Sequence, residues 1–157
     1  MKSLLVIFSL ALLATGCLKS TNGSVCTDVS PATEEPTIQA YCTANFINAT
    51  KDSSGLYYQI ISPGTAPMPD LNDSVYVNYT GKYLTGTVFD QSSAPIGFIL
   101  GQLIPGWVIG LEKIGAGGQM KLVVPSSLAY GCQGYGPIQP NTVLYFDLMV
   151  TKLVQNP

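Results

Sequence analysis

Apolar and polar residues alternate along several segments of this chain, with the period of two that is typical of β-strands. In residues 142–153, the longest such segment, the alternation places large apolar side chains on one face: Leu144, Phe146, Leu148 and Val150. Shorter segments that alternate or are rich in strand-forming residues are 56–62, 75–79, 82–84, 87–90, 98–100 and 119–124. The pattern predicts about five antiparallel strands, with residues 91–95 as a loop.

A different pattern occupies residues 101–112, GQLIPGWVIGLE, which contain the only tryptophan, Trp107. A helix can begin at Pro105, where the missing N–H is tolerated, and apolar residues then fall on nearly every side of it. Such a helix is normally buried, and this one is far too short to span a membrane. We therefore expect an α+β fold, in which an antiparallel half-barrel sheet of five to six strands wraps around one short helix.

The N-terminus has the features of an export signal. Lys2 is followed by an apolar run from residue 4 to residue 13 and by Ala14-Thr15-Gly16-Cys17. Small residues directly before a cysteine resemble a bacterial lipoprotein signal, which is cut before the cysteine whose thiol then takes the lipid. We expect residues 1–16 to be this signal and Cys17 the lipidation site. An ordinary secretory signal that happens to contain a cysteine is the alternative.

Two further segments precede the main domain. Residues 17–36 are rich in Ser, Thr, Asn, Pro and acidic residues, which predicts a flexible tether. Residues 37–54 are expected to form a short helix, with Pro36 as a plausible first helical residue, and a connector. The main domain is then expected to occupy residues 55–157.

Cys26, Cys42 and Cys132 remain beyond the signal. Export to an oxidising compartment permits a disulfide, and three pairings are possible. We take Cys26 and Cys42 as the candidate pair, because both precede the main domain. The chain has no Cys-x-x-Cys spacing, so the sequence predicts no metal site.

Composition excludes several classes of function. The chain has no histidine and no arginine, and its net charge is −2. Imidazole-based acid–base chemistry and imidazole metal sites are therefore excluded, and the clustered basic face that binds nucleic acid is missing. Aromatic residues are abundant instead, with nine Tyr and five Phe, and in a chain that is 10% charged they must pack or line a site.

Six short segments occur in an order and at intervals that resemble the FKBP-type peptidyl-prolyl cis–trans isomerases. They are Val77-Asn78-Tyr79-Thr80-Gly81, Gly86-Thr87-Val88-Phe89-Asp90, Phe98-Ile99-Leu100-Gly101, Ile104-Pro105-Gly106-Trp107, Leu128-Ala129-Tyr130-Gly131 and Leu144-Tyr145-Phe146-Asp147. The resemblance covers roughly residues 56–153. With its lipoprotein-type signal, the chain is similar to membrane-anchored FKBPs of bacterial envelopes.

The resemblance implies a pocket on the concave face of the sheet, closed by the helix. The residues carried over as catalytic are Tyr79, Phe89, Asp90, Trp107, Tyr130 and Phe146. Leu103 and Ile104 are implied as substrate-binding, the latter also through its backbone N–H, and Ile138 is expected to overhang the rim. Phe98, Leu100 and Leu144 are expected to be core residues.

The chain departs from the family pattern beside the pocket. Many FKBPs pair the aspartate of the second segment with an arginine, and this chain has none. Asp90 must then be satisfied by tyrosine hydroxyls, backbone groups or water, because an unpaired carboxylate in an apolar pocket is costly. The departure bears on substrate preference and rate more than on the fold.

The resemblance implies an enzyme (EC 5.2.1.8) that accelerates X–Pro isomerisation during the folding of exported proteins, with no cofactor or metal. The alternatives are a non-catalytic module or holdase that retains proline-containing segments, and a structural envelope lipoprotein with a vestigial pocket. The expected partners are proline-containing segments of exported polypeptides and, through Cys17, the membrane. The expected location is the bacterial envelope, at the outer membrane since Lys19 is not an aspartate, and the expected state is a monomer.

Overall fold

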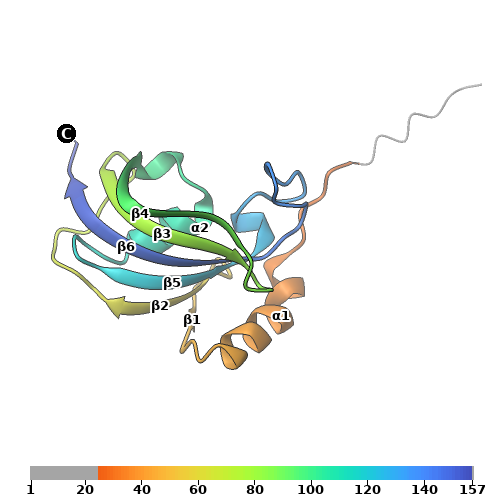
Figure 1. Ribbon diagram of the computed structural model, residues 1–157. Coiled ribbons are helices and arrows are strands. Elements are labelled where there is room, and N and C mark those ends of the chain that lie inside the picture. Colours follow the sequence, from red (N-terminus) through yellow and green to blue (C-terminus); the bar gives the residue numbers. More distant parts are fainter. Residues whose placement is uncertain (1–24, 157) are drawn as a thin grey trace, which may run out of the picture.

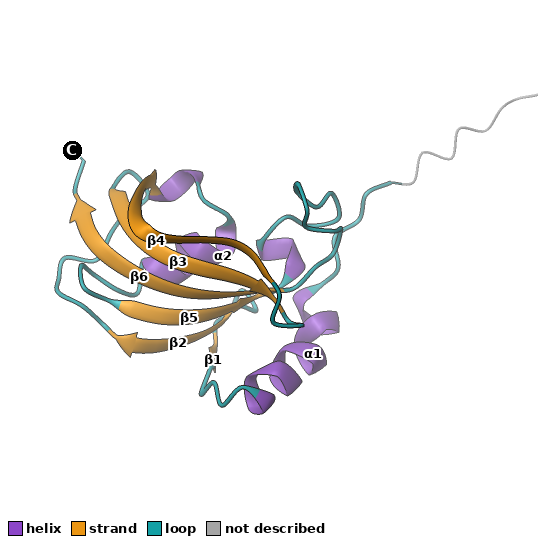
Figure 2. Cartoon of the chain, in the orientation of Figure 1, coloured by secondary structure: helices purple, strands orange, loops and turns teal. Residues whose placement is uncertain are grey.

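The computed structural model describes residues 25–156, which form one curved sheet and two α-helices (Figures 1 and 2). The six antiparallel strands lie in the order β1-β2-β5-β6-β3-β4. The elements are α1 (Pro31–Ala44), β1 (Thr50–Lys51), β2 (Tyr57–Ser62), β3 (Ser74–Tyr83), β4 (Val88–Ile99), the 3-10 turn η1 (Leu100–Gln102), α2 (Pro105–Leu111), β5 (Gln119–Val124), the 3-10 turn η2 (Ser126–Leu128) and β6 (Leu144–Val154). The predicted fold class, a sheet around a short helix, is confirmed.

Three predictions about the N-terminus fall on residues that the structure does not describe. The signal peptide at residues 1–16 and the lipidation site Cys17 lie outside residues 25–156, as does the first part of the predicted tether. Within residues 25–156, neither α-helix is long and apolar enough to cross a membrane.

The central strand β6 has a buried residue at every second position from Leu144 to Val150, as the sequence predicts. It pairs with β3 on one side and β5 on the other. Its buried inner positions are Leu144, Phe146, Leu148 and Val150, each 3% exposed or less. Alternation also places Tyr145 on the opposite face, where it packs with Ile38 and Cys42 of α1. The two faces of the sheet therefore carry two separate cores, one facing α2 and one covered by α1.

The short helix α2 lies behind the sheet in Figure 2 and packs closely against it. Pro105 takes its first position, and its buried face carries Trp107 and Leu111. Two glycines allow the close approach, since a Cβ at Gly106 would collide with Val124 and one at Gly110 would come within 2.9 Å of Leu122. The prediction of one or two enclosed helical turns from Pro105 is confirmed.

The hairpin of β3 and β4 is more regular than the sequence predicts. Strand β3 runs without a break through Thr80-Gly81, and β4 continues through residues 91–95, which we expected to be a loop. Extra residues of β4 are accommodated where the register shifts between Val77 and Tyr79. Pro95 is tolerated because β4 is an edge strand, so one side of it needs no ladder hydrogen bonds.

Helix α1 begins at Pro31, five residues before Pro36, which the sequence predicted as its first residue. Ser30 caps it by accepting a hydrogen bond from the Ala32 N–H, and Pro31 supplies the favourable first position. Pro36 therefore lies inside the helix. The sequence prediction gave Pro36 the role that Pro31 has, because both prolines fit the start of a helix.

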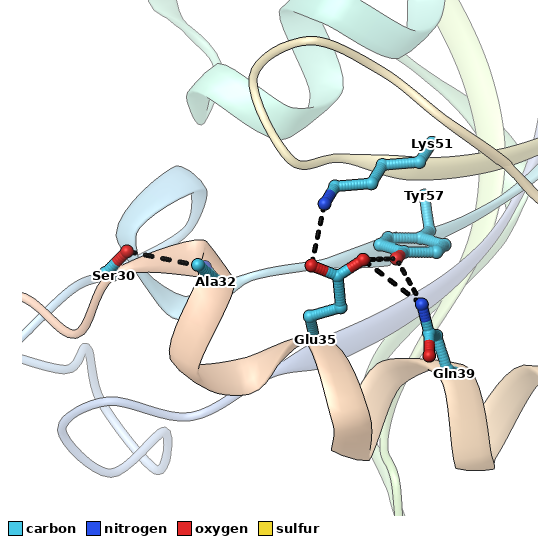
Figure 3. Close-up of polar contacts among 6 residues, drawn as sticks. All are labelled: Ser30, Ala32, Glu35, Gln39, Lys51 and Tyr57. Carbon is cyan, nitrogen blue, oxygen red and sulfur yellow. Dashed lines mark hydrogen bonds and ion pairs between the residues drawn. The ribbon is translucent and has the colours of Figure 1, made fainter.

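Polar contacts of Glu35 and Gln39 link α1 to the sheet (Figure 3). The Glu35 carboxylate lies 2.7 Å from the Lys51 ammonium of β1 and accepts a hydrogen bond from the Tyr57 hydroxyl at 2.7 Å. Gln39 donates to the same carboxylate at 3.1 Å. The lysine hydrogen bond, followed by that of Tyr57, lowers the pKa of Glu35. The Lys51 and Glu35 side chains are partly exposed, so their ion pair orients α1 and contributes little to stability.

A second glutamate of α1 is buried. Glu34 is 8% exposed, and its carboxylate accepts a hydrogen bond from the Ser126 N–H at 2.8 Å. We predict that Glu34→Ala lowers the free energy of unfolding by about 1–3 kcal/mol, because it leaves a buried N–H without a partner. Urea unfolding measures this change. The exposed Glu112→Ala variant should change stability by less than about 0.5 kcal/mol, and an equal effect of both variants would contradict the prediction.

The predicted disulfide pair is wrong. Cys26 is bonded to Cys132, with the two Cα atoms 5.5 Å apart, and within residues 25–156 the buried Cys42 has no disulfide partner. The reason is helix α1, which separates Cys26 from Cys42. Within this helix Cys42 lies about 16 Å along the axis from Pro31, whereas bonded cysteines need Cα atoms about 4.4–6.8 Å apart.

Candidate active site

A pocket of about 140 Å³ opens on the inner side of the sheet, above α2. Its lining is aromatic and aliphatic apart from one carboxylate and the tyrosine hydroxyls. It consists of Tyr79, Phe89, Asp90, Phe98, Leu103, Ile104, Trp107, Tyr130 and Phe146. The structure thus brings together all six residues predicted to be catalytic and two of the three predicted to bind substrate.

The side chains of the lining reach the pocket from several elements of the fold. Tyr79 comes from β3, Phe89 and Asp90 from the start of β4, and Phe146 from β6. Gly81 makes room for two of these rings, because a Cβ there would come within 2.6 Å of Phe89 and 2.9 Å of Phe146. Substitution at this glycine would therefore displace the aromatic wall.

The Trp107 indole, which is 5% exposed, lies at the centre of the aromatic contacts. Its centroid is 5.3 Å from the Tyr79 ring, 5.3 Å from the Phe146 ring and 6.2 Å from the Phe98 ring, with interplanar angles of 76–88°. Phe89 extends the set by an edge contact with Phe146 at 5.7 Å. Edge-to-face pairs at these distances are favourable, and together they make a firm apolar floor and wall.

Asp90 has a tyrosine partner in place of the missing arginine. The Tyr79 hydroxyl donates to the Asp90 carboxylate at 2.7 Å, which is one of the solutions expected from the sequence. Residue Asp90 is also exposed, so water reaches its other oxygen positions. Burial, and then the hydrogen bond to Asp90, raise the pKa of Tyr79 to about 12.

We predict a pH dependence of stability from this tyrosine. Its pKa is about 12 in the folded state against an ordinary value of 10.0, so its contribution is complete below pH 10 and is lost as the pH rises towards 12. The free energy of unfolding should therefore fall more steeply between about pH 9 and about pH 11.5 in the wild type than in Tyr79→Phe. Urea unfolding of both proteins measures it, and parallel curves would contradict the assignment.

Within residues 25–156, three hydrogen-bond donors of the lining residues are without a protein partner. One is the buried Trp107 indole N–H, which has no hydrogen-bond partner in the part of the chain that the structure describes. Among the described residues, neither the Ile104 N–H nor the Tyr130 hydroxyl has a partner. Ile104 immediately precedes α2, and its carbonyl accepts from the Trp107 N–H at 2.9 Å. Tyr130 follows η2 and stacks on Tyr135 with centroids 5.2 Å apart. Burial is the main reason that the pKa of Tyr130 is raised, so its hydroxyl stays protonated near neutral pH.

Two expectations about the site need correction. Phe98, expected to be a core residue, lines the pocket; it pairs with Val75 in the sheet, so its side chain shares the inner face. The pairing with Val75 is the signal that could have identified Phe98 as a residue of the pocket face. Ile138 was expected at the rim, but it is 5% exposed and packs in the main core. A tight turn holds it there, with hydrogen bonds between Ile138 and Tyr135 at 2.8 and 2.9 Å.

Comparison with known proteins agrees with the segments described above. The profile of the family described as FKBP-type peptidyl-prolyl cis-trans isomerase matches residues 66–151. The chain is 44% identical over 108 residues to the FKBP-type peptidyl-prolyl cis-trans isomerase FkpA of Escherichia coli, a match that covers 67% of this chain and 40% of FkpA. It is 43% identical over 99 residues to the outer membrane protein MIP of Legionella longbeachae, covering 60% of this chain and 42% of MIP.

Solved structures of peptidyl-prolyl cis-trans isomerases match the fold of this chain. The crystal structure of E. coli FkpA matches with a TM-score of 0.71 and 37% identity, over 81% of this chain and 62% of that one. A peptidyl-prolyl cis-trans isomerase from Pseudomonas syringae matches with a TM-score of 0.68 and 32% identity, over 82% of this chain and 99% of that one. The chain spans about 40% of the length of FkpA and 42% of MIP. On its sequence, fold and pocket, this chain belongs to the FKBP-type peptidyl-prolyl cis–trans isomerase family.

Proposed function

We propose that the chain catalyses cis–trans isomerisation of X–Pro bonds in the pocket around Trp107. The observation that carries the proposal is this aromatic pocket, whose lining has hydrogen-bond donors without a partner among the described residues, including the Ile104 N–H and the Tyr130 hydroxyl. Rotation about a peptide bond has a barrier of about 18–20 kcal/mol, which comes from amide resonance. No proton transfer and no covalent intermediate is needed, so a site without histidine is sufficient.

Catalysis would come from tighter binding of the twisted amide than of the planar one. The twisted form has lost its resonance, and its carbonyl is therefore less polar. The rings of Trp107, Phe89 and Phe146 surround the prolyl group with apolar surface that favours the less polar form. The Ile104 N–H and the Tyr130 hydroxyl would hold the flanking peptide. Asp90, already engaged by Tyr79, would keep that ring in place and move no proton.

We propose that the substrates are proline-containing segments of exported polypeptides. We also propose that the protein is a monomer, anchored at the bacterial outer membrane by a lipid on Cys17. Two observations support this address. The disulfide between Cys26 and Cys132 suits an oxidising compartment, and one relative is named an outer membrane protein.

We predict that the full chain partitions with membranes and that Cys17→Ser moves it to the soluble fraction. Equal partitioning of both would contradict the anchor.

A proline-limited peptide assay tests the activity. With the full chain present in catalytic amount, the cis-to-trans relaxation of a Leu-Pro or Phe-Pro peptide should become faster in proportion to protein concentration. An unchanged relaxation rate would overturn the proposal. If Trp107 fluorescence still responded to the peptide in that case, the chain would be a non-catalytic module that binds proline-containing segments.

A further inference from the structure

The loop that carries Tyr130, residues 126–132, is attached at two points to residues from the N-terminal side of the chain. At its start, the Ser126 N–H donates to the Glu34 carboxylate of α1 at 2.8 Å. Just after Tyr130, the Cys132 N–H donates to the Asp28 carboxylate at 2.7 Å, and Cys132 is bonded to Cys26. Figure 1 shows the orange segment before α1 beside the blue loops that precede β6. Tyr130 thus lies between two attachments to the N-terminal segment.

The contact beside Tyr130 is close. Gly131 has a positive φ of +56°, and a Cβ there would collide with the Asp28 carboxylate. The backbone of the residue next to Tyr130 is therefore in direct contact with the segment before α1. Within the domain itself, Gly131 is held by two hydrogen bonds, one to Ser126 and one from Asn141, each 2.8 Å long.

The Tyr130 ring has limited support of its own. It is half-buried, and the ring that stacks on it belongs to Tyr135, which is 68% exposed. The pocket end of the ring carries the free hydroxyl that we assign to the substrate. Since a displacement of about 1 Å can cost up to about 100-fold in rate, the backbone that carries Tyr130 must be held firmly.

We propose that Asp28 and the Cys26–Cys132 disulfide are positioning residues for Tyr130, so that the segment before α1 is a working part of the active site. This inference rests on the proposed function. None of the three residues lines the pocket, so their effect on catalysis passes through the loop and Tyr130. The N-terminal segment of this chain is therefore more than a tether.

A double-mutant cycle in the full chain tests the proposal. The variants are Cys26→Ala/Cys132→Ala, which removes the disulfide, and Asp28→Ala, which keeps it; each is made with Tyr130 and with Tyr130→Phe. With Tyr130 present, each should lower kcat/KM for a Phe-Pro peptide by about tenfold. In the Tyr130→Phe background, the same changes should have almost no further effect. Lys51→Ala is the matched control, because Lys51 contacts the Glu35 carboxylate of α1 (Figure 3) and, among the described residues, makes no hydrogen bond to residues 126–132.

The outcomes separate this inference from the proposed function. A loss confined to the Tyr130 background supports the positioning role, and Asp28→Ala alone suffices if the disulfide variant does not fold. An equal loss in both backgrounds, or no loss, overturns the positioning role while the isomerase activity stands. A wild-type chain that does not accelerate isomerisation overturns the proposed function, and this inference with it.

Discussion

Replacing Phe89 with alanine is expected to lower kcat/KM for a Phe-Pro peptide by roughly 10- to 200-fold. The ring forms the wall of the pocket, in edge contact with Phe146 at 5.7 Å and in contact with Tyr83 at 5.2 Å. A phenylalanine side chain contributes about 1.5–3 kcal/mol when apolar surface is removed from water around it, and this corresponds to the expected factor. The proline-limited assay measures the loss directly.

The neighbouring Val88→Ala variant is the control for this result. Val88 is on the same strand but is 43% exposed and does not line the pocket. Its kcat/KM should stay within about twofold of the wild type. Urea unfolding of both variants separates a change in the pocket from a change in stability. Equal activity of Phe89→Ala and wild type would exclude this wall from the site.

Removing the disulfide should cause the largest change in stability. The bond between Cys26 and Cys132 spans 106 positions of the sequence. Closing a loop of about 100 residues lowers the entropy of the unfolded chain by an amount worth about 4–5 kcal/mol. Cys26→Ala/Cys132→Ala should therefore lose about that much free energy of unfolding, and its Tm should fall by more than about 10 °C.

Reduction supplies the control for the disulfide. Unfolding the wild type in the presence of a dithiol should reproduce the loss, whereas the same reagent should leave the double variant unchanged. Cys42→Ala removes a cysteine without a disulfide partner, so its unfolding should remain sensitive to the dithiol. A double variant as stable as the wild type would contradict the prediction.

The parts of the fold that the sequence predicts well are those with a strong local pattern. Alternation along residues 142–153 is enough to identify the inner face of β6, since every second residue from Leu144 to Val150 is buried. The run around Trp107 is apolar on all sides, and only an enclosed helix suits it. The spaced aromatic segments were enough to bring eight lining residues into one pocket.

The parts that were missed depend on contacts between distant residues. Phe98 looks like a core residue until the register of β4 against β3 places it beside Val75. Pro95 suggests a loop unless the strand is known to lie at the edge of the sheet. The pairing of Cys26 with Cys132 follows from the path of the chain around α1, which no spacing of cysteines encodes.

The central claim is that the pocket around Trp107 interconverts the two isomers of an X–Pro bond. Exchange NMR of a Phe-Pro peptide at equilibrium tests it without a coupled reaction. Uncatalysed exchange takes tens to hundreds of seconds, so the cis and trans signals are otherwise unlinked on the timescale of the experiment. A catalytic amount of the full chain should produce exchange cross-peaks that Phe89→Ala strongly weakens. Cross-peaks that are missing with the wild type, or undiminished with Phe89→Ala, would contradict the claim.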